Sequence, residues 1–568
     1  MTKYLRLRAD LALLASGTPT FATLADQIAE DRDLSPTRRR DMLSGIARVA
    51  QALGSPTTDI PCNGRWLQPR LARITPAQLG VTPKTWANSL SNLRSAMAHA
   101  GLVEHRKRRI GDLSPEWSAL WTQVLEAKDP TVAPAARRFV FFLSAMGVLP
   151  EDVSQADAEA FREALIRNEV SKDPDTAWRL AINGWNLAGQ RFPDWPRIRL
   201  HLPDRSKTIL MPEATYPAGF IQELDALIGW LAAPDLLSEA AGARPLSAAT
   251  RKQYRRQILR FAATLVQAGM AAEEIPELAV LIDPPIAERG LRQMLARNGN
   301  QTSRTIADMA GLLRNLARLL DAPEPQRAAL KLLAKKLALP PQKGMTEKNR
   351  ARLRILQDLA QQRRLLNMPD DIFARPVRAT RRYSDLLARE DALATALLLA
   401  CPLRIKNLAE IDLDRHLQRP GKGSVFLVIQ STETKGGRPI EFELPEGVVA
   451  LLDAHLTSRA PELCPPATRF LFPKRCGTDS IDPNALSARI AKRLRKELGI
   501  EMNAHLFRHF AVMLWLDANP GGYEVARRLL GHKELSHTIN MYSGLEAKSA
   551  SRAFADLVGS LREGKQWP

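Results

Sequence analysis

Apolar residues recur at spacings of three and four along residues 1–365, and prolines and glycines interrupt this pattern at intervals. Such a period is typical of amphipathic helices rather than strands. We therefore predict that this region is almost entirely helical and consists of an N-terminal helical module followed by two more. The predicted domains, including a C-terminal one, are residues 1–110, 111–205, 218–365 and 370–560.

One helical pattern occurs three times in this region. Each copy begins with a basic amphipathic helix and ends with a second helix that stops near a small residue. The copies lie at about 35–101, 117–196 and 247–320. Either they are true repeats, or they are the alternation that any helical bundle produces. We predict linkers at 105–109, 203–217 and 345–375.

The helical period breaks twice in the C-terminal domain. Residues 424–430 form a short apolar run of strand type, and Ile440, Phe442 and Leu444 alternate with glutamates as in a half-buried strand. Gly436 and Gly437 between them predict a turn. Helices are expected again at about 446–457, 483–498, 504–516 and 522–530. The predicted fold class is mainly α, with helical modules followed by a mostly helical domain that holds a small antiparallel sheet.

Charge and composition narrow the kind of partner. The chain of 568 residues has a formal net charge of +20 and a pI near 10.1, which favours a polyanion such as nucleic acid. A basic housekeeping protein from a GC-rich genome is the alternative explanation for this charge, since arginine and alanine are abundant. The four cysteines show no CxxC spacing, so neither a zinc site nor a redox motif is supported, and a reducing cytoplasm is expected. We find no signal-peptide pattern and no apolar run of about 18 residues that could span a membrane.

Six side chains near the C-terminus could together break a phosphodiester without a metal: Arg404, Lys435, His505, Arg508, His532 and Tyr542. Arginines remain protonated and can neutralise the charge that a phosphate gains in the transition state. A tyrosine can attack and stay attached, while lysine and histidine move protons. Plainer explanations exist, because Arg404 could be a solvated helix-end arginine and Tyr542 a core residue. Lys422 is a rival for Lys435.

The order Arg, Lys, His-x-x-Arg, Gly-His, Tyr resembles the tyrosine recombinase (phage integrase-like) family of site-specific DNA recombinases. The resemblance covers about residues 375–555, and its His-x-x-Arg spacing selects His505 over His509. Two departures occur: Asn407 stands where the family usually has a carboxylate, and Tyr542 follows His532 by one residue more than usual.

The resemblance implies an enzyme that cleaves and rejoins DNA strands through a 3′-phosphotyrosine, with Tyr542 as nucleophile and Lys435 protonating the leaving 5′ oxygen. It implies double-stranded DNA as partner, a homotetramer on paired sites, no cofactor or metal, and a place in the bacterial cytoplasm at the nucleoid. Integration or transposition of a mobile element fits this chemistry. The alternatives are a type IB topoisomerase-like relaxing enzyme and a non-catalytic DNA-binding protein that pairs sites.

Basic residues beside helix caps, and one in the predicted turn, are candidates for DNA contacts. Phosphate contacts from lysine and arginine supply much of the affinity of DNA-binding proteins. The candidates are Arg38, Arg39, Arg40, Arg251, Lys252, Arg255, Arg256 and Arg438.

Overall fold

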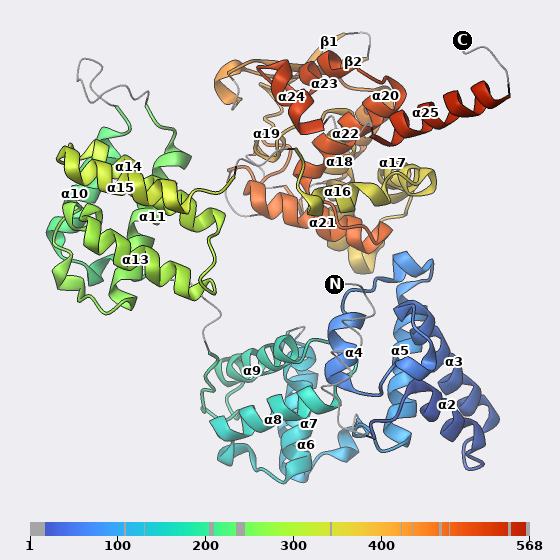
Figure 1. Ribbon diagram of the computed structural model, residues 1–568. Helices are drawn as coiled ribbons and strands as arrows, with labels where there is room; N and C mark the ends of the chain where they lie inside the picture. Colours follow the sequence, from blue (N-terminus) through green and yellow to red (C-terminus); the bar gives the residue numbers. More distant parts are fainter. Residues whose placement is uncertain are drawn as a thin grey trace. The chain divides into compact units, whose positions relative to one another are not determined.

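Helices dominate the computed structural model, and the helical fold class with a small antiparallel sheet is confirmed (Figure 1). The structure describes residues 17–106, 109–129, 131–203, 210–233, 245–340, 344–421, 423–434, 437–459, 461–464, 468–475, 478–542 and 547–563. The chain divides into two compact units, one formed by 1–202 with 343–568 and the other by 203–342. Among the helices described, none is both long and apolar enough to cross a membrane.

The first group of helices, drawn in blue in Figure 1, comprises α2 (Phe21–Glu30), α3 (Pro36–Leu53), α4 (Gly64–Leu71) and α5 (Pro83–His99). Ser35 caps α3 by accepting a hydrogen bond from the Arg38 N–H, and Pro36 occupies the first helical position, where its missing N–H is not needed. A Cβ on Gly45 of α3 would lie 2.8 Å from the Leu93 nitrogen of α5, so glycine permits this close helix contact. The hydrophobic core of this group also includes Val170, which lies in the next group.

The second group comprises α6 (Pro115–Glu126), α7 (Val132–Met146), α8 (Gln155–Asn168) and α9 (Pro174–Arg191). Its core is rich in tryptophan, and the indole N–H of Trp117, Trp178 and Trp185 each donates to a backbone carbonyl at 2.7–2.8 Å. These three buried indoles are thereby satisfied as hydrogen-bond donors as well as packed, whereas the indole N–H of Trp195 in the same core has no partner among the described residues. Gly184 of α9 meets α7 as closely as Gly45 meets α5.

The second compact unit contains a core of its own. Its helices are α10 (Ala218–Trp230), α11 (Ala248–Gln267), α12 (Ala279–Ile282), α13 (Pro284–Arg297), α14 (Arg304–Leu319) and α15 (Glu324–Leu337). Phe261 of α11 packs against Gly290 of α13, where a Cβ would approach the ring to 2.6 Å. Close packing around Phe261 therefore depends on the absence of a side chain at this position.

The C-terminal region starts earlier than we predicted. The segment 345–375 was predicted to be a linker, but it forms α16 (Glu347–Ile355) and α17 (Leu359–Phe373). Leu353, Leu365 and Met368 from these helices are buried in the C-terminal core. The linker prediction was wrong because these apolar residues are separated by many charged ones, and Pro369 lies within α17.

Beyond α17 the region continues with α18 (Arg382–Ala400) and the short α19 (Ile405–Ala409), and then a three-stranded antiparallel sheet. Its strands are β1 (Leu417–Gly421), β2 (Ser424–Ile429) and β3 (Ile440–Glu443), with β2 in the middle. Val425, Leu427 and Ile429 of β2 are buried, as alternation in a half-buried strand requires. The helices that follow are α20 (Glu446–Ser458), α21 (Pro483–Leu498), α22 (Ala504–Ala518), α23 (Tyr523–Leu530), α24 (Leu535–Tyr542) and α25 (Ala547–Arg562).

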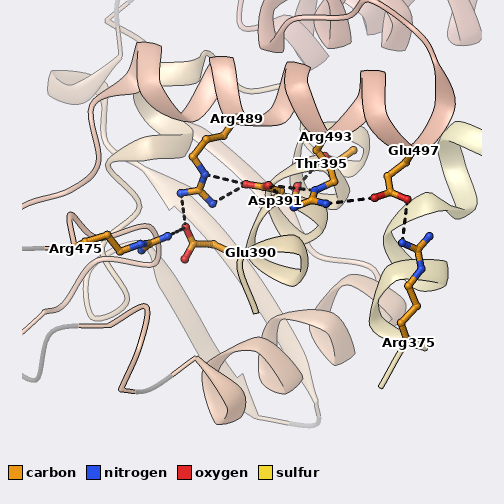
Figure 2. A network of polar contacts seen from close by, with 8 residues as sticks. All are labelled: Arg375, Glu390, Asp391, Thr395, Arg475, Arg489, Arg493 and Glu497. Atoms are coloured by element: carbon orange, nitrogen blue, oxygen red, sulfur yellow. Dashed lines mark hydrogen bonds and ion pairs between the residues drawn. The ribbon is translucent and has the colours of Figure 1, made fainter. Parts of the chain in front are cut away.

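A buried ionic network joins α18 to α21 (Figure 2). Glu390 and Asp391 of α18 are 0% and 3% exposed, and Arg489 of α21 bonds to both, with Nη1–Oε1 at 2.8 Å and Nη2–Oδ1 at 2.6 Å. Arg475 adds a bond to Glu390, and Arg493 adds one to Asp391. Each buried carboxylate is thus paired with two guanidinium groups, as a charge in a low-dielectric interior requires. The helix α18 leads to Arg404, and α21 leads to α22.

Candidate active site

Three of the polar side chains at the site come from the first turns of α22. Asn503 caps this helix by accepting from the Leu506 N–H, and His505, Arg508 and His509 follow. Arg508 and His509 are each 4% exposed, whereas His505 keeps contact with solvent. Residues three and four apart lie on one helix face, so these side chains point to one region.

Arg508 is held by two backbone carbonyls from separate segments. Its Nη1 donates to the Pro402 oxygen at 2.6 Å and its Nη2 to the Leu530 oxygen at 2.7 Å. Burial, together with the charge of Arg404, lowers the pKa of Arg508 to about 10, and Tyr542 acts in the opposite direction. The guanidinium therefore remains protonated at neutral pH while its orientation is fixed, which is the arrangement that a preorganised anion-binding group needs.

Arg404 is the N-cap residue of α19 and is half-buried. Partial desolvation lowers the pKa of His505, and the charges of Arg508 and Arg404 lower it further, so both arginines act on this imidazole. The site thus places two positive guanidinium groups near one histidine that is disposed to remain neutral.

Asn407, where the family usually has a carboxylate, connects α19 to the turn before β3. Its Nδ2 donates to the Glu433 carbonyl oxygen at 3.1 Å. The next residue, Thr434, closes the turn, because its Oγ1 donates to the Arg438 oxygen at 2.7 Å and accepts from the Arg438 N–H at 3.1 Å. Lys435 and its rival Lys422 lie outside the described residues, whereas Glu433, two positions before Lys435 in the sequence, is tied directly to the helix that Arg404 begins.

His532 follows Gly531, whose φ of +60° ends α23 in the left-handed conformation that glycine adopts readily. The ring Nδ1 lies 3.0 Å from the hydroxyl oxygen of the fully buried Thr538, and Arg527 donates to the His532 carbonyl at 2.9 Å. The imidazole is therefore positioned by α24 and the backbone by α23.

Tyr542 is the last residue of α24 and is 2% exposed. Burial raises the pKa of its phenol to about 12, although the charge of Arg508 works against this rise. The phenol ring meets the His509 ring edge-on at 5.4 Å between centroids, and the His509 ring meets that of His505 at 4.9 Å. His505, His509 and Tyr542 thus form a continuous row of rings beside Arg508.

His509 is the residue that our sequence reasoning set aside. Burial lowers its pKa to about 4, with smaller contributions from His505, Arg508 and His532, and its Nδ1 has no hydrogen-bond partner among the described residues. The spacing of four residues from His505 was a usable signal, since it places both rings on one helix face. Only the structure shows that His509 contacts Tyr542.

The candidate DNA-contacting residues differ in exposure to solvent and in the contacts that they make within the protein. Arg38, Lys252, Arg256 and Arg438 are exposed. Arg40 lies 3.7 Å from Asp41, Arg251 is half-buried, and Arg39 donates to the backbone of its own group, at Asp31 and Leu34. Arg255 is paired with Glu213 and Asp225. Among the residues that the structure describes, no cluster of three potential metal ligands occurs.

The mostly helical C-terminal domain, which also holds a small sheet, brings together two arginines, three histidines and a tyrosine, and these include the arginines, histidines and tyrosine that the tyrosine recombinase resemblance implies. Residues 376–548 match the family model described as the phage integrase family, and this region of the chain belongs to that family. The protein is therefore a recombinase that cleaves and rejoins DNA strands.

Several solved structures are similar at low identity. One XerH site-specific recombinase bound to its palindromic difH substrate is 14% identical, covers 62% of this chain and 99% of its own, and has a TM-score of 0.34. The Tn1549 transposon integrase with transposon right end DNA is 16% identical, covers 58% and 99%, and has a TM-score of 0.36. The XerA recombinase is 14% identical over 59% and 98%, with a TM-score of 0.27. A search of curated proteins finds no match. These scores are low, so the family assignment rests on the match at 376–548.

Proposed function

We propose that Tyr542 is the nucleophile of a site-specific DNA recombinase and that Arg404 and Arg508 bind the scissile phosphate. The observation that carries this proposal is the placement of the Tyr542 phenol beside Arg508, whose charge acts directly on it. A positive charge favours the ionised phenol, so the same group that binds the phosphate assists the attack.

In the proposed step, the Tyr542 Oη bonds to phosphorus and the bond from phosphorus to the 5′ oxygen breaks. The phenol proton passes to a base, for which His505 has the lowered pKa of a neutral imidazole. Lys435 supplies a proton to the departing 5′ oxygen. Removing one donor to the transition-state phosphate, such as Arg404, should slow cleavage by about 100- to 1,000-fold.

A tyrosine that is 2% exposed cannot touch a phosphodiester in this arrangement. Cleavage therefore includes a displacement of α24 that brings Tyr542 out of the hydrophobic core. His532 is linked through Thr538 to α24, the helix that ends at Tyr542. We therefore expect His532 and Tyr542 to move together.

The remaining features of the proposal concern assembly and context. Helical modules and catalytic domain would grip the duplex together, four protomers would hold two sites, and strands would be exchanged through the 3′-phosphotyrosine. The net charge of +20 supports extensive phosphate contacts. A bacterial, nucleoid-associated enzyme of an integrating or transposing element is the setting that we propose.

The test uses a nicked suicide duplex that traps covalent protein–DNA adducts. We expect adducts with the native chain in excess EDTA and without ATP, and none with Tyr542→Phe, which retains the ring. Tyr523→Phe is the matched control, because Tyr523 lies in α23 of the same domain. Adducts in Tyr542→Phe would make another residue the nucleophile, and strict dependence on Mg²⁺ would disprove the metal-free mechanism. Relaxation of supercoiled DNA without recombination would favour the topoisomerase alternative.

A further inference from the structure

His509 is a buried polar side chain that the proposed reaction does not use. It lies in α22 one residue after Arg508, and it is 4% exposed. Its ring Nδ1 is buried and has no hydrogen-bond partner among the residues that the structure describes. An unpartnered buried nitrogen makes the folded state less stable, because water no longer reaches it. Such atoms are rare in proteins, so a site that keeps one requires an explanation.

One neighbour of the His509 imidazole is Tyr542 itself. The two rings meet edge-on, with 5.4 Å between their centroids and 61° between their planes, and Tyr542 is 2% exposed. The His509 ring also meets the ring of His505, at 4.9 Å and 81°. Because His505 is exposed, the row of rings runs from the surface of the site to its buried tyrosine.

The surroundings of His509 keep its imidazole neutral while Tyr542 is buried. Burial is the main cause that lowers the pKa of His509 to about 4, and the charges of His505 and Arg508 in α22 and of His532 after α23 lower it further. Burial also raises the pKa of the Tyr542 phenol to about 12, so this group is uncharged at neutral pH. The contact between His509 and Tyr542 therefore joins two neutral rings, and no ion pair strengthens it.

We propose that His509 is a positioning residue for the nucleophile, because its unpartnered nitrogen makes the buried position of Tyr542 easier to leave. This inference rests on the proposed function, in which α24 is displaced before cleavage. When Tyr542 moves out, water reaches the His509 Nδ1, and the cost of burying that nitrogen disappears. The pKa of the imidazole then returns to its ordinary value near 6.5, so the released state takes up a proton that the buried state does not hold. Release of the nucleophile is thereby coupled to the hydration of one imidazole.

The experiment measures the exposure of Tyr542 in the full-length protein by hydroxyl-radical footprinting with mass spectrometry. Tyr383, which is 48% exposed, is the internal reference. The test variant is His509→Phe, which keeps an aromatic ring against Tyr542 and removes the nitrogen. Oxidation of Tyr542 relative to Tyr383 should fall by at least about fivefold, because the free energy that favours release is lost.

The matched control is His455→Phe. His455 lies on α20 and is 1% exposed, and its Nε2 also has no hydrogen-bond partner within the described part of the chain. This substitution removes an equivalent nitrogen from the same domain and should leave the oxidation of Tyr542 unchanged. A second variant, His509→Gln, keeps a polar side chain and loses the ring, so it should not reduce the oxidation of Tyr542. Circular dichroism verifies the fold of each variant. If His509→Phe does not fold, His509→Gln decides, and reduced oxidation in that variant would overturn the proposal.

A pH series separates this role from a merely structural one. Release of Tyr542 adds a proton to His509 between about pH 4 and 6.5, so lowering the pH favours release. The ratio of Tyr542 oxidation in the native chain to that in His509→Phe should therefore rise by about tenfold from pH 7.5 to 5.5. His505 and His532 are present in both proteins, so their own titration cancels in this ratio. A ratio that does not change with pH would overturn the proposal.

Adduct formation on the suicide duplex is measured in parallel, and adducts should form more slowly with His509→Phe than with the native chain or with His455→Phe. Equal oxidation of Tyr542 or equal adduct rates in His509→Phe and the native chain would overturn the proposal. The nucleophile assignment would still stand in that case if Tyr542→Phe forms no adducts. Adducts in Tyr542→Phe would refute that assignment alone, because oxidation reports the exposure of Tyr542 whether or not this residue attacks DNA.

Discussion

Arg489→Leu should destabilise the catalytic region far more than the loss of a typical surface ion pair. Arg489 is the one residue in Figure 2 that bonds to both buried carboxylates of α18. After the substitution, Glu390 keeps Arg475 and Asp391 keeps Arg493. Each carboxylate then remains in the interior with half of its partners, and Glu390 Oε2 already lacks one.

Removing one partner of a buried ion pair destabilises a protein by about 3 to 5 kcal/mol. The matched control is Arg419→Leu, since Arg419 pairs with Asp453 at a site where the two side chains are 48% and 50% exposed. An exposed pair of this kind contributes about 1 kcal/mol or less. The two variants remove the same chemical group and differ mainly in burial.

Hydrogen exchange followed peptide by peptide is the suitable assay, because a chain with several hydrophobic cores does not unfold in one step. A loss of about 3 kcal/mol speeds exchange in α18 and α21 by more than about 100-fold. Cleavage should fall as well, because these helices lead to Arg404 and to α22. If exchange accelerates no more for Arg489→Leu than for Arg419→Leu, the network stabilises no more than a surface pair and the reasoning is wrong.

Two further predictions concern the histidines and Asn407. Burial, aided by nearby arginines or histidines, lowers the pKa of His455 to about 3 and that of His509 to about 4, so both are neutral when folded and bind protons more readily when unfolded. The contribution of each neutral histidine to the free energy of unfolding is therefore fully present above a pH of about 6.5. At about pH 5, the free energy of unfolding is lower by about 2 kcal/mol for each histidine. Thermal unfolding measured at these two pH values should show the loss of stability. The His455→Gln variant should lose less stability between them, and a variant that keeps the full pH dependence would contradict the prediction. Asn407→Ala should slow adduct formation by about fivefold, because one hydrogen bond of about 1 kcal/mol to Glu433 is lost. Asn407→Asp should be slower still, since its carboxylate would face a carbonyl oxygen, and faster cleavage by this variant would refute that geometry.

The sequence alone was enough to predict those parts of the structure that depend on the order of neighbouring residues. The helix predicted at 504–516 is α22 at Ala504–Ala518, and the strand predicted at 424–430 is β2 at Ser424–Ile429. His505 and Arg508 share a helix face because spacing alone determines it. The sequence indicated a core position for Tyr542 only as an alternative, because the burial of this residue depends on how α24 packs on distant segments. The buried Glu169 likewise depends on distant segments, because its partners Arg106 and Arg138 lie 63 and 31 residues away.

The hydrophobic cores also determine the order in which the chain can fold during synthesis. Three of them are drawn from single continuous stretches, so each can form once its own segment has emerged. The first core differs, because Val170 fills a place in it beside residues 21–103. The N-terminal helices therefore reach their final packing only after the chain has been made as far as Val170. The segment bearing Tyr542 is among the last to join its core.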